Sequence, residues 1–195
     1  MSKSFRHACW HAHANGVAAP PLMRHWLTDQ RSLTAKLIDH STRFTVRRLR
    51  QGVAVCLADE YAEIGLSHQR QVRERDVLLQ CDDQPVVFAH TVIPLAASAA
   101  DWPFFSALGN RSLGATLFND PQVVRGPFAY ARLQPTHPLS IRARATTDME
   151  WRERPLFARR SLFRRAAGVM LVTEVFLPAI LALREASRPV NDPGK

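Results

Sequence analysis

The sequence predicts an α+β fold, a single domain in which a mainly antiparallel β-sheet carries a few packed helices. Two observations lead to this prediction. Apolar runs rich in β-branched and aromatic residues recur along the chain and are joined by short polar turns, which is typical of hairpins. The 195 residues are enough for one domain with its own core, and the hydrophobic fraction of 46% excludes general disorder.

The charge and the cysteines limit the class of protein. The net charge of +9 can attract nucleic acid, an acidic membrane surface or a small anionic substrate. The sequence has no zinc-finger spacing and no aromatic RNA-binding motif, so we expect no nucleic-acid partner. The cysteines Cys9, Cys56 and Cys81 form no disulfide pattern, and we therefore expect a cytoplasmic protein.

No segment of the sequence is typical of a membrane anchor or a secretion signal. The most apolar stretch, residues 169–183, is interrupted by Glu174 and Pro178 and is too short to span a bilayer. The basic N-terminus lacks an apolar core followed by a small-residue cleavage site. We expect no membrane anchor, and the expected oligomeric state is a monomer.

The chain divides into three parts by composition. Residues 1–20 are expected to be a flexible N-terminal arm, residues 21–183 the folded domain and residues 184–195 a mobile C-terminal tail. Histidines in the arm can ligate a metal ion, but no matching ligands follow at short spacing, so we expect no metal site.

Two short helices are expected at the start of the domain. Residues 21–28 are apolar enough for a helix that docks on the core, and Ser32 is placed to cap a second helix over residues 33–39. Leu33 and Leu37 lie one turn apart and predict the buried face of the second helix.

Strands are expected next. Residues 44–57 indicate two strands with a turn or bulge at Gln51-Gly52. Residues 72–81 and 85–94 flank the polar turn Asp82-Asp83-Gln84 and predict a hairpin.

Arg75 leads into an apolar strip of this hairpin, because side chains alternate along a strand and Val77 and Leu79 share its face. A guanidinium in such a place can hold a carboxylate by two hydrogen bonds. The alternative is a structural role, in which Arg75 pairs with Asp76 or Glu74 or faces solvent.

The middle of the chain predicts more helix. Residues 96–100 and 102–108 favour helix that stops at Gly109-Asn110, and Ser112 can cap another short helix over residues 113–118. Gly114 in that helix permits a close approach of the backbone to a ligand or to another strand.

The last third of the chain returns to strands. Residues 123–133 predict a strand interrupted at Gly126-Pro127, and residues 139–146 favour no single structure. Residues 156–165 predict a strand that turns back at Ala166-Ala167-Gly168.

The run from Val169 to Pro178 predicts a mostly buried strand with one carboxylate, Glu174, in its middle. A three-residue turn before this strand places Arg160 opposite Glu174, and a two-residue turn places Ser161 there. Two interpretations of the carboxylate remain. Glu174 forms a structural ion pair with an arginine of the neighbouring strand, or it acts as a general acid from a buried position.

These segments together resemble the chorismate lyase family over residues 26–181. No single motif is specific, but the order and spacing of the motifs are. They are Ser32-Leu33-Thr34, Arg75-Asp76-Val77-Leu78-Leu79, Thr91-Val92-Ile93-Pro94, Ser112-Leu113-Gly114, Arg159-Arg160-Ser161 and Thr173-Glu174-Val175-Phe176-Leu177-Pro178.

The resemblance implies a fold and a site. The fold is a small antiparallel sheet with helices that form flaps over an internal ligand pocket. The family's pocket arginine corresponds to Arg75, its acidic residue to Glu174, and a backbone contact to Leu113, beside Gly114. A methionine contact of the family falls on Leu33, which conserves the bulk of the side chain.

The resemblance also implies a reaction, the elimination of pyruvate from chorismate to give 4-hydroxybenzoate for ubiquinone biosynthesis. Aromatisation of the ring drives this lyase reaction, so no cofactor is expected. We expect Arg75 to hold a carboxylate of the dianionic substrate. We expect Glu174 either to supply a proton to the departing group or to hold the ring hydroxyl in a concerted elimination. Substrate and product then contact Arg75, Leu113, Gly114, Glu174 and Leu33.

Two other functions are compatible with parts of the sequence. The same fold type serves as a small-molecule-sensing domain in bacterial transcription regulators, which bind a ligand without turnover. No winged-helix segment stands before the domain here, and this favours the enzyme. A nucleic-acid-binding module would use the positive charge, but the arginines are scattered and the acidic strand suits it poorly.

Overall fold

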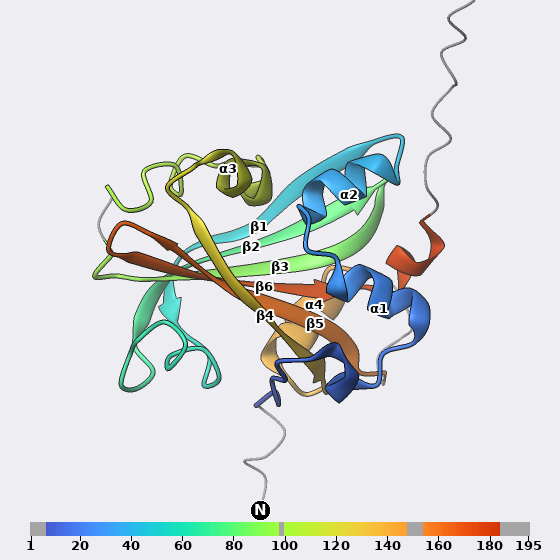
Figure 1. The fold of residues 1–195 in the computed structure, drawn as a ribbon, viewed down its shortest axis with the longest axis horizontal. Helices are drawn as coiled ribbons and strands as arrows, with labels where there is room; N and C mark the ends of the chain where they lie inside the picture. Colours follow the sequence, from blue (N-terminus) through green and yellow to red (C-terminus); the bar gives the residue numbers. More distant parts are fainter. Residues whose placement is uncertain (1–6, 98–99, 148–153, 184–195) are drawn as a thin grey trace, which may run out of the picture.

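The computed structural model describes residues 7–97, 100–147 and 154–183, and its centre is a six-stranded antiparallel sheet (Figure 1). The strand order is β1-β2-β3-β6-β5-β4, so the last strand of the chain, β6, lies beside β3 in the middle of the sheet. The predicted α+β fold with an antiparallel sheet is confirmed.

The elements along the described chain are short. The strands are β1 (Phe44–Val55), β2 (Gln71–Cys81), β3 (Gln84–Pro94), β4 (Val124–Leu133), β5 (Leu156–Arg165) and β6 (Gly168–Phe176). The helices are α1 (Pro21–Thr28), α2 (Leu33–Asp39), α3 (Leu113–Asn119) and α4 (Pro138–Arg144), with 3-10 helices η2 (Ala14–Val17) and η3 (Pro178–Ala182).

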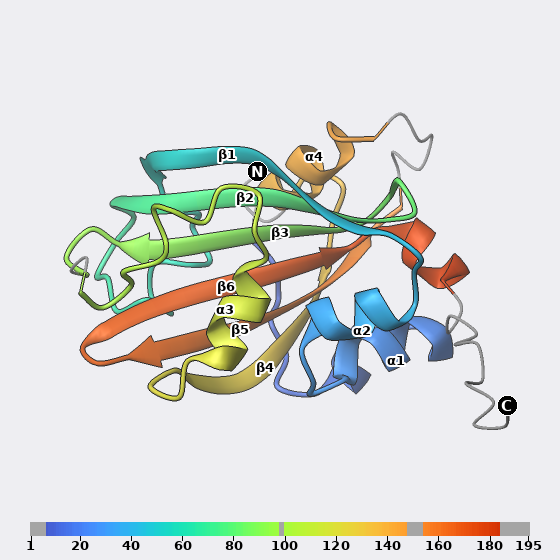
Figure 2. The same cartoon turned by 90° about the horizontal axis from the view of Figure 1, so that it is seen from above.

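Both faces of the sheet are covered, which explains the near-continuous apolar character of its central strands. Figure 2 shows α1, α2 and α3 on one face of the sheet and α4 on the other. The core under α1 and α2 includes Leu27, Leu37 and Val87. The core under α4 includes Phe88 and Leu139, so neighbouring residues of β3 serve opposite cores.

The predicted helix starts at Ser32 and Ser112 are confirmed. The Ser32 hydroxyl accepts a hydrogen bond from the Ala35 amide, and the Ser112 hydroxyl accepts one from the Ala115 amide. Each cap satisfies an amide that has no partner within its helix.

The predicted hairpin of β2 and β3 is also confirmed, with Asp82 and Asp83 in its turn. Their φ angles are 49° and 64°, which a tight turn between antiparallel strands requires and aspartate tolerates. The Asp82 carboxylate also accepts hydrogen bonds from the amides of Thr42 and Arg43, which ties this turn to the start of β1.

Two predictions of local structure are wrong. Residues 44–55 form one strand, because pairing with β2 continues through Gln51 and Gly52, and the register shift lies between Arg48 and Arg50. The described residues of the expected helix over 96–100, which are 96, 97 and 100, are not helical, and residues 102–108 form turns and bends instead of a helix. Their apolar spacing has another cause, since Trp102, Phe105 and Leu108 are buried against the sheet.

Helix α4 was not singled out by the sequence pattern, although both signals for its start are present. A proline occupies its first turn, where the missing amide costs no hydrogen bond. The ring of His137 caps the helix by accepting from the Leu139 amide at 3.2 Å.

The described part of the expected arm packs on the sheet. The backbones of His11 and Tyr130 exchange two hydrogen bonds of 2.8 Å, and Ala14 and Val17 are buried. The segment from His11 to Val17 is therefore held against β4, unlike a free arm. The expected tail, residues 184–195, lies outside the described residues.

No helix in the described ranges is long and apolar enough to cross a membrane. No three histidine, cysteine, aspartate or glutamate side chains within the same ranges are placed to share a metal ion.

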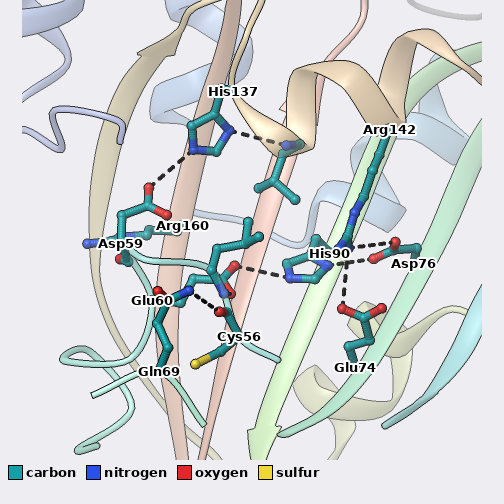
Figure 3. Close-up of polar contacts among 12 residues, drawn as sticks. Cys56, Asp59, Glu60, Gln69, Glu74, Asp76, His90, His137, Arg142 and Arg160 are labelled. Atoms are coloured by element: carbon teal, nitrogen blue, oxygen red, sulfur yellow. Dashed lines mark hydrogen bonds and ion pairs between the residues drawn. The ribbon is translucent and has the colours of Figure 1, made fainter. Parts of the chain in front are cut away.

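A buried ionic cluster lies on the α4 face of the sheet (Figure 3). Nε2 of His90 lies 3.0 Å from Oε1 of Glu60, and Nδ1 lies 2.5 Å from Oδ1 of Asp76. Arg142 of α4 reaches Asp76 at 3.2 Å and Glu74 at 3.3 Å. Burial alone would lower the pKa of His90, but Glu60 and Asp76 outweigh burial and raise this pKa to about 10. His90 is therefore a cation at neutral pH, shared by two buried carboxylates.

Replacing His90 with glutamine is expected to destabilise the fold by about 3–5 kcal/mol, because Glu60 and Asp76 lose their shared cation. Urea unfolding at neutral pH measures the change. His68→Gln is the matched control, because His68 is exposed and should change stability by less than about 0.5 kcal/mol. A loss in His90→Gln no larger than in the control contradicts the ionic role.

The same charge predicts a pH dependence of stability. The pKa of His90 rises from its ordinary value of 6.5 to about 10 on folding, so its contribution is complete below pH 6.5 and is lost as the pH rises to about 10. The difference in unfolding free energy between wild type and His90→Gln should shrink steadily across this window. A constant difference would mean that the folded ring is neutral.

Candidate active site

A cavity of about 630 Å³, measured out to its opening, lies between the sheet and the helices α2 and α3. Five of the six strands contribute to its floor and walls, and only β1 does not. Its polar lining consists of Arg31, Thr34, Arg75, Thr91, Ser112, Arg125, Arg159, Ser161 and Glu174. Its apolar lining includes Leu33, Val77, Leu79, Leu113, Leu117, Phe118, Phe128, Phe163 and Val172.

All five residues that the sequence singled out line this one cavity. Arg75 comes from β2, Glu174 from β6, Leu33 from α2, and Leu113 and Gly114 from α3. The strands β2 and β6 lie on either side of β3, where Arg75 pairs with Thr91 and Glu174 pairs with Ala89. Thr91 and Ala89 are two residues apart, so the guanidinium and the carboxylate lie on the same covered face.

Arg75 is fully buried but only partly satisfied. Its Nη2 donates to the carbonyls of Gly109 and Arg111 at 3.1 and 2.9 Å, whereas its buried Nε has no partner among the described residues. Burial, with Arg48 nearby, lowers the pKa of Arg75 to about 10, so the side chain is still a cation at neutral pH. The structural alternative of pairing with Asp76 or Glu74 does not occur. An anionic ligand can supply the missing acceptor.

Glu174 lies opposite Arg159, and both registers expected from the sequence are wrong. Gly168 belongs to β6 and pairs with Arg165, so the turn contains only Ala166 and Ala167. This two-residue turn is one of the two expected lengths, but the count that gave Ser161 for it ran in the wrong direction along β5. Shortening the turn moves the partner from Arg160 to Arg159, and Ser161 pairs with Val172.

The Arg159 guanidinium connects Glu174 to the end of α1. Its Nε donates to Oε2 of Glu174 at 2.5 Å, and its Nη1 donates to the carbonyls of Trp26, Leu27 and Asp29 at 3.4, 3.1 and 2.7 Å. The ion-pair interpretation of Glu174 is thus correct. The Glu174 side chain nevertheless keeps 19% of its surface exposed in the cavity wall, so an ion-paired carboxylate remains open to a ligand.

The helices α2 and α3 touch each other over the cavity. The hydroxyl oxygens of Thr34 and Ser112 lie 2.7 Å apart, a hydrogen-bond distance. A Cβ on Gly114 would lie 2.8 Å from Oγ1 of Thr34, which is too close for two non-bonded atoms. Gly114 is therefore needed for the approach of α2, and not for an approach to a strand.

Sequence reasoning missed three arginines of the cavity, Arg31, Arg125 and Arg159. Arg159 lies in a quoted motif, but the pairing was assigned one residue away. The alternation of Arg159, Ser161 and Phe163 on one face of β5 would have shown it, had the turn length been known. Arg125 carries no local signal, because its position depends on β4 lying beside β5.

Comparison with known proteins gives the family. Residues 5–185 match the sequence profile of a family described as chorismate lyase. The chain belongs to the chorismate lyase family. A protein of Cupriavidus metallidurans named "Probable chorismate pyruvate-lyase" is 49% identical over 175 residues, which cover 89% of this chain and 82% of that protein. A protein of the same name from Cupriavidus pinatubonensis is 47% identical over 189 residues, covering 93% of this chain and 94% of the relative.

Solved structures share the fold of this chorismate lyase family member at low identity. The C-terminal domain of the histidine utilization repressor from Pseudomonas syringae has a TM-score of 0.52 at 11% identity, covering 70% of this chain and 93% of that chain. PhnF from Mycobacterium smegmatis has a TM-score of 0.53 at 14% identity, covering 77% and 65%. At these identities the likeness shows the fold alone.

Gly114→Ala is expected to separate α2 from α3, because the added Cβ cannot be placed 2.8 Å from Thr34 Oγ1 without movement. Amide hydrogen exchange in α3 should become faster. Gly52→Ala is the control, since a Cβ there meets nothing within 4 Å. Adding Thr34→Ala to Gly114→Ala removes the obstructing oxygen and should bring exchange back toward the wild-type rate. Unchanged exchange in Gly114→Ala alone would contradict this account.

Proposed function

We propose that this protein is a chorismate pyruvate-lyase, which eliminates pyruvate from chorismate without a cofactor and releases 4-hydroxybenzoate. One observation carries the proposal. A member of the chorismate lyase family has a covered cavity in which a buried cation with an unpaired donor, Arg75, and an ion-paired carboxylate, Glu174, line the same space.

The reaction depends more on positioning of the substrate than on chemically reactive side chains. Chorismate has a ring carboxylate at C1, an enolpyruvyl ether at C3 and a hydroxyl at C4. The C3–O bond breaks, C4 loses its hydrogen, and the enolpyruvyl group takes up a proton on its methylene carbon and leaves as pyruvate. Aromatisation of the ring makes the step favourable. The protein has to hold both carboxylates and fix the conformer in which the reacting bonds are aligned.

Arg75 is the proposed partner of the ring carboxylate. Its unpaired Nε is buried, and a charge-assisted hydrogen bond made away from water is a strong one. The amide of Leu113, in the first turn of α3, is the proposed second donor to this carboxylate. Leu33 and Gly114 complete the same end of the cavity, Leu33 by its bulk and Gly114 by letting α2 and α3 close together.

Glu174 is the proposed partner of the ring hydroxyl. Its Oε2 already accepts from Arg159 at 2.5 Å, so the group acts as a carboxylate acceptor with one oxygen left for the ligand. This pairing favours a hydrogen bond from the C4 hydroxyl during a concerted elimination over proton donation to the departing group. The carboxylate, held in place by Arg159, then fixes the C4 hydroxyl in the orientation that the elimination needs.

The setting of the reaction is proposed from the family resemblance. 4-Hydroxybenzoate is the aromatic precursor of ubiquinone, so we assign the protein to ubiquinone biosynthesis. The free cysteines Cys9, Cys56 and Cys81 are compatible with work in the cytoplasm. We assign catalysis to residues 21–183, acting as a monomer.

The function is tested by incubating the purified protein with chorismate in the absence of added cofactors. The expected result is the release of 4-hydroxybenzoate and pyruvate in equal amounts. Binding of chorismate without release would instead identify a small-molecule sensor, and steeply salt-dependent binding of DNA or RNA would identify a nucleic-acid-binding module. Either result without turnover contradicts the proposal.

Glu174→Gln should lower kcat by about 10²-fold while changing KM little, because the neutral amide is a weaker acceptor in the transition state. Steady-state kinetics with chorismate measure both constants. Glu63→Gln is the matched control, because Glu63 also pairs with an arginine, Arg160, but lies outside the cavity. Equal kinetics in the two variants would remove Glu174 from the mechanism.

Arg75→Ala should weaken binding of both chorismate and 4-hydroxybenzoate by about tenfold or more, because both carry the ring carboxylate. Arg73→Ala is the control on the same strand, since Arg73 is exposed and does not line the cavity. Inhibition constants for the product and KM for the substrate give the comparison. A loss limited to one of the two ligands would contradict the assignment.

A further inference from the structure

The cavity has a second guanidinium with unused donors, on the side away from Arg75. Arg125 comes from β4 and Arg75 from β2, and the strands β3, β6 and β5 lie between them. At about 4.8 Å per step, the two backbones are about 19 Å apart along the sheet. Both side chains line the same cavity, so the space between their charged ends suits a ligand with an anion at each end.

The guanidinium of Arg125 is held in place by hydrogen bonds from only one of its nitrogens. Its Nη2 donates to the main-chain and side-chain oxygens of Gln30 at 2.7 and 3.1 Å. Its guanidinium lies 4.4 Å from the ring centre of Phe128 and 5.4 Å from that of Phe118. Within the described part of the chain, its Nε and Nη1 have no hydrogen-bond acceptor and no carboxylate pairs with it.

The surroundings of Arg125 favour an added anion. Burial, followed by the nearby charge of Arg159, lowers the pKa of Arg125. Both causes disfavour the cation, and a carboxylate placed beside it would offset both. The aromatic faces of Phe118 and Phe128 keep water from one side of the guanidinium, which strengthens such a pair.

The other two arginines of the cavity, Arg159 and Arg31, form hydrogen bonds to other groups of the protein. Arg159 directs its Nε to Glu174 and its Nη1 to the three carbonyls at the end of α1. Arg31 directs its Nε and Nη2 to the carboxylate of Asp29. Arg75 and Arg125 are therefore the two cations best placed to bind ligand anions.

We propose that Arg125 binds the carboxylate of the enolpyruvyl group while Arg75 binds the ring carboxylate, so that Arg125 is the residue that distinguishes the dianionic substrate from the monoanionic product. This inference rests on the proposed function and adds a subsite to it. When pyruvate leaves, the contact with Arg125 leaves with it, and 4-hydroxybenzoate is held from the Arg75 end alone.

The test uses two ligands that differ by one carboxylate. 3-(Carboxymethoxy)-4-hydroxybenzoate is a dianion with its second carboxylate on an ether at C3, and 3-methoxy-4-hydroxybenzoate is the matching monoanion. Titration calorimetry with the full chain gives Kd for each. Arg125→Gln should raise Kd for the dianion by about tenfold or more and leave Kd for the monoanion within about threefold of wild type. KM for chorismate should rise with Kd for the dianion, with a smaller change in kcat.

Three further variants separate recognition from structure. Arg132→Gln removes an exposed arginine of the same strand and should leave both Kd values unchanged. Gln30→Ala removes one acceptor of Arg125 but keeps the guanidinium, and should keep the preference for the dianion. Arg125→Lys keeps a positive charge and should recover part of the lost affinity.

The outcomes of these measurements separate the proposal for Arg125 from the proposed function. If Arg125→Gln weakens both ligands equally, Arg125 only supports the segment of Gln30 and the proposal is wrong. It is also wrong if Kd for the dianion does not change, or if the wild type does not prefer the dianion. If the wild type prefers the dianion through Arg125 but does not turn over chorismate, the proposed function fails and the two-anion site stands. If chorismate is turned over and Arg125→Gln has no effect, only the subsite fails.

Discussion

Arg159 and Glu174 face each other across β5 and β6, and the walls of the cavity are arranged around their ion pair. The same guanidinium satisfies three carbonyls at and after the end of α1, so one side chain fixes both the carboxylate and the segment that leads into α2. Removing either charge from such a buried pair costs about 3–5 kcal/mol. The two-residue turn at Ala166 and Ala167 sets this pairing, and a turn longer by one residue would put Arg160 in its place.

The sheet keeps opposite charges apart by the alternation of its side chains. On the α4 face, Glu74 and Asp76 form ion pairs with Arg50, Arg142 and His90. Arg75 lies between them in sequence but faces the cavity. If all three side chains shared a face, the two acids would occupy the donors of Arg75, and no unpaired Nε would remain for a ligand. The alternation of side chains along β2 therefore explains both the buried ionic cluster on one face and the unpaired Nε of Arg75 on the other.

Local signals predicted the parts of the fold that short-range physics decides. The caps at Ser32 and Ser112 and the turn at Asp82 and Asp83 depend on residues close in sequence, and they form as expected. The expected helix over residues 102–108 does not form, because packing of its apolar side chains on the sheet produces the same spacing from turns. The arm was expected to be free because its composition is polar, and composition does not reveal a backbone that pairs with Tyr130.

Some residues of the candidate site could likewise be recognised from the local sequence, and others depend on how the strands pair. Glu174 and Arg75 stand out because each is a charge in an apolar strand, which a sequence shows directly. The partner of Glu174 depends on one residue of register, which the sequence leaves open between turn lengths. Arg125 is recognisable only after β4 is placed at the edge of the sheet beside β5, since no neighbour in sequence marks it.

The other edge of the sheet has a consequence for how copies of this chain behave toward one another. Among the described residues, β1 is a long strand that pairs with another strand on one side only, and such an edge is a template on which another chain can extend the sheet. Its exposed Arg47, Arg48 and Arg50 would meet the same residues of a neighbouring copy, and the irregularity between Arg48 and Arg50 breaks the ladder that aggregation needs. Part of the surplus of arginine therefore opposes edge-to-edge pairing of two copies, apart from any role in attracting an anionic substrate.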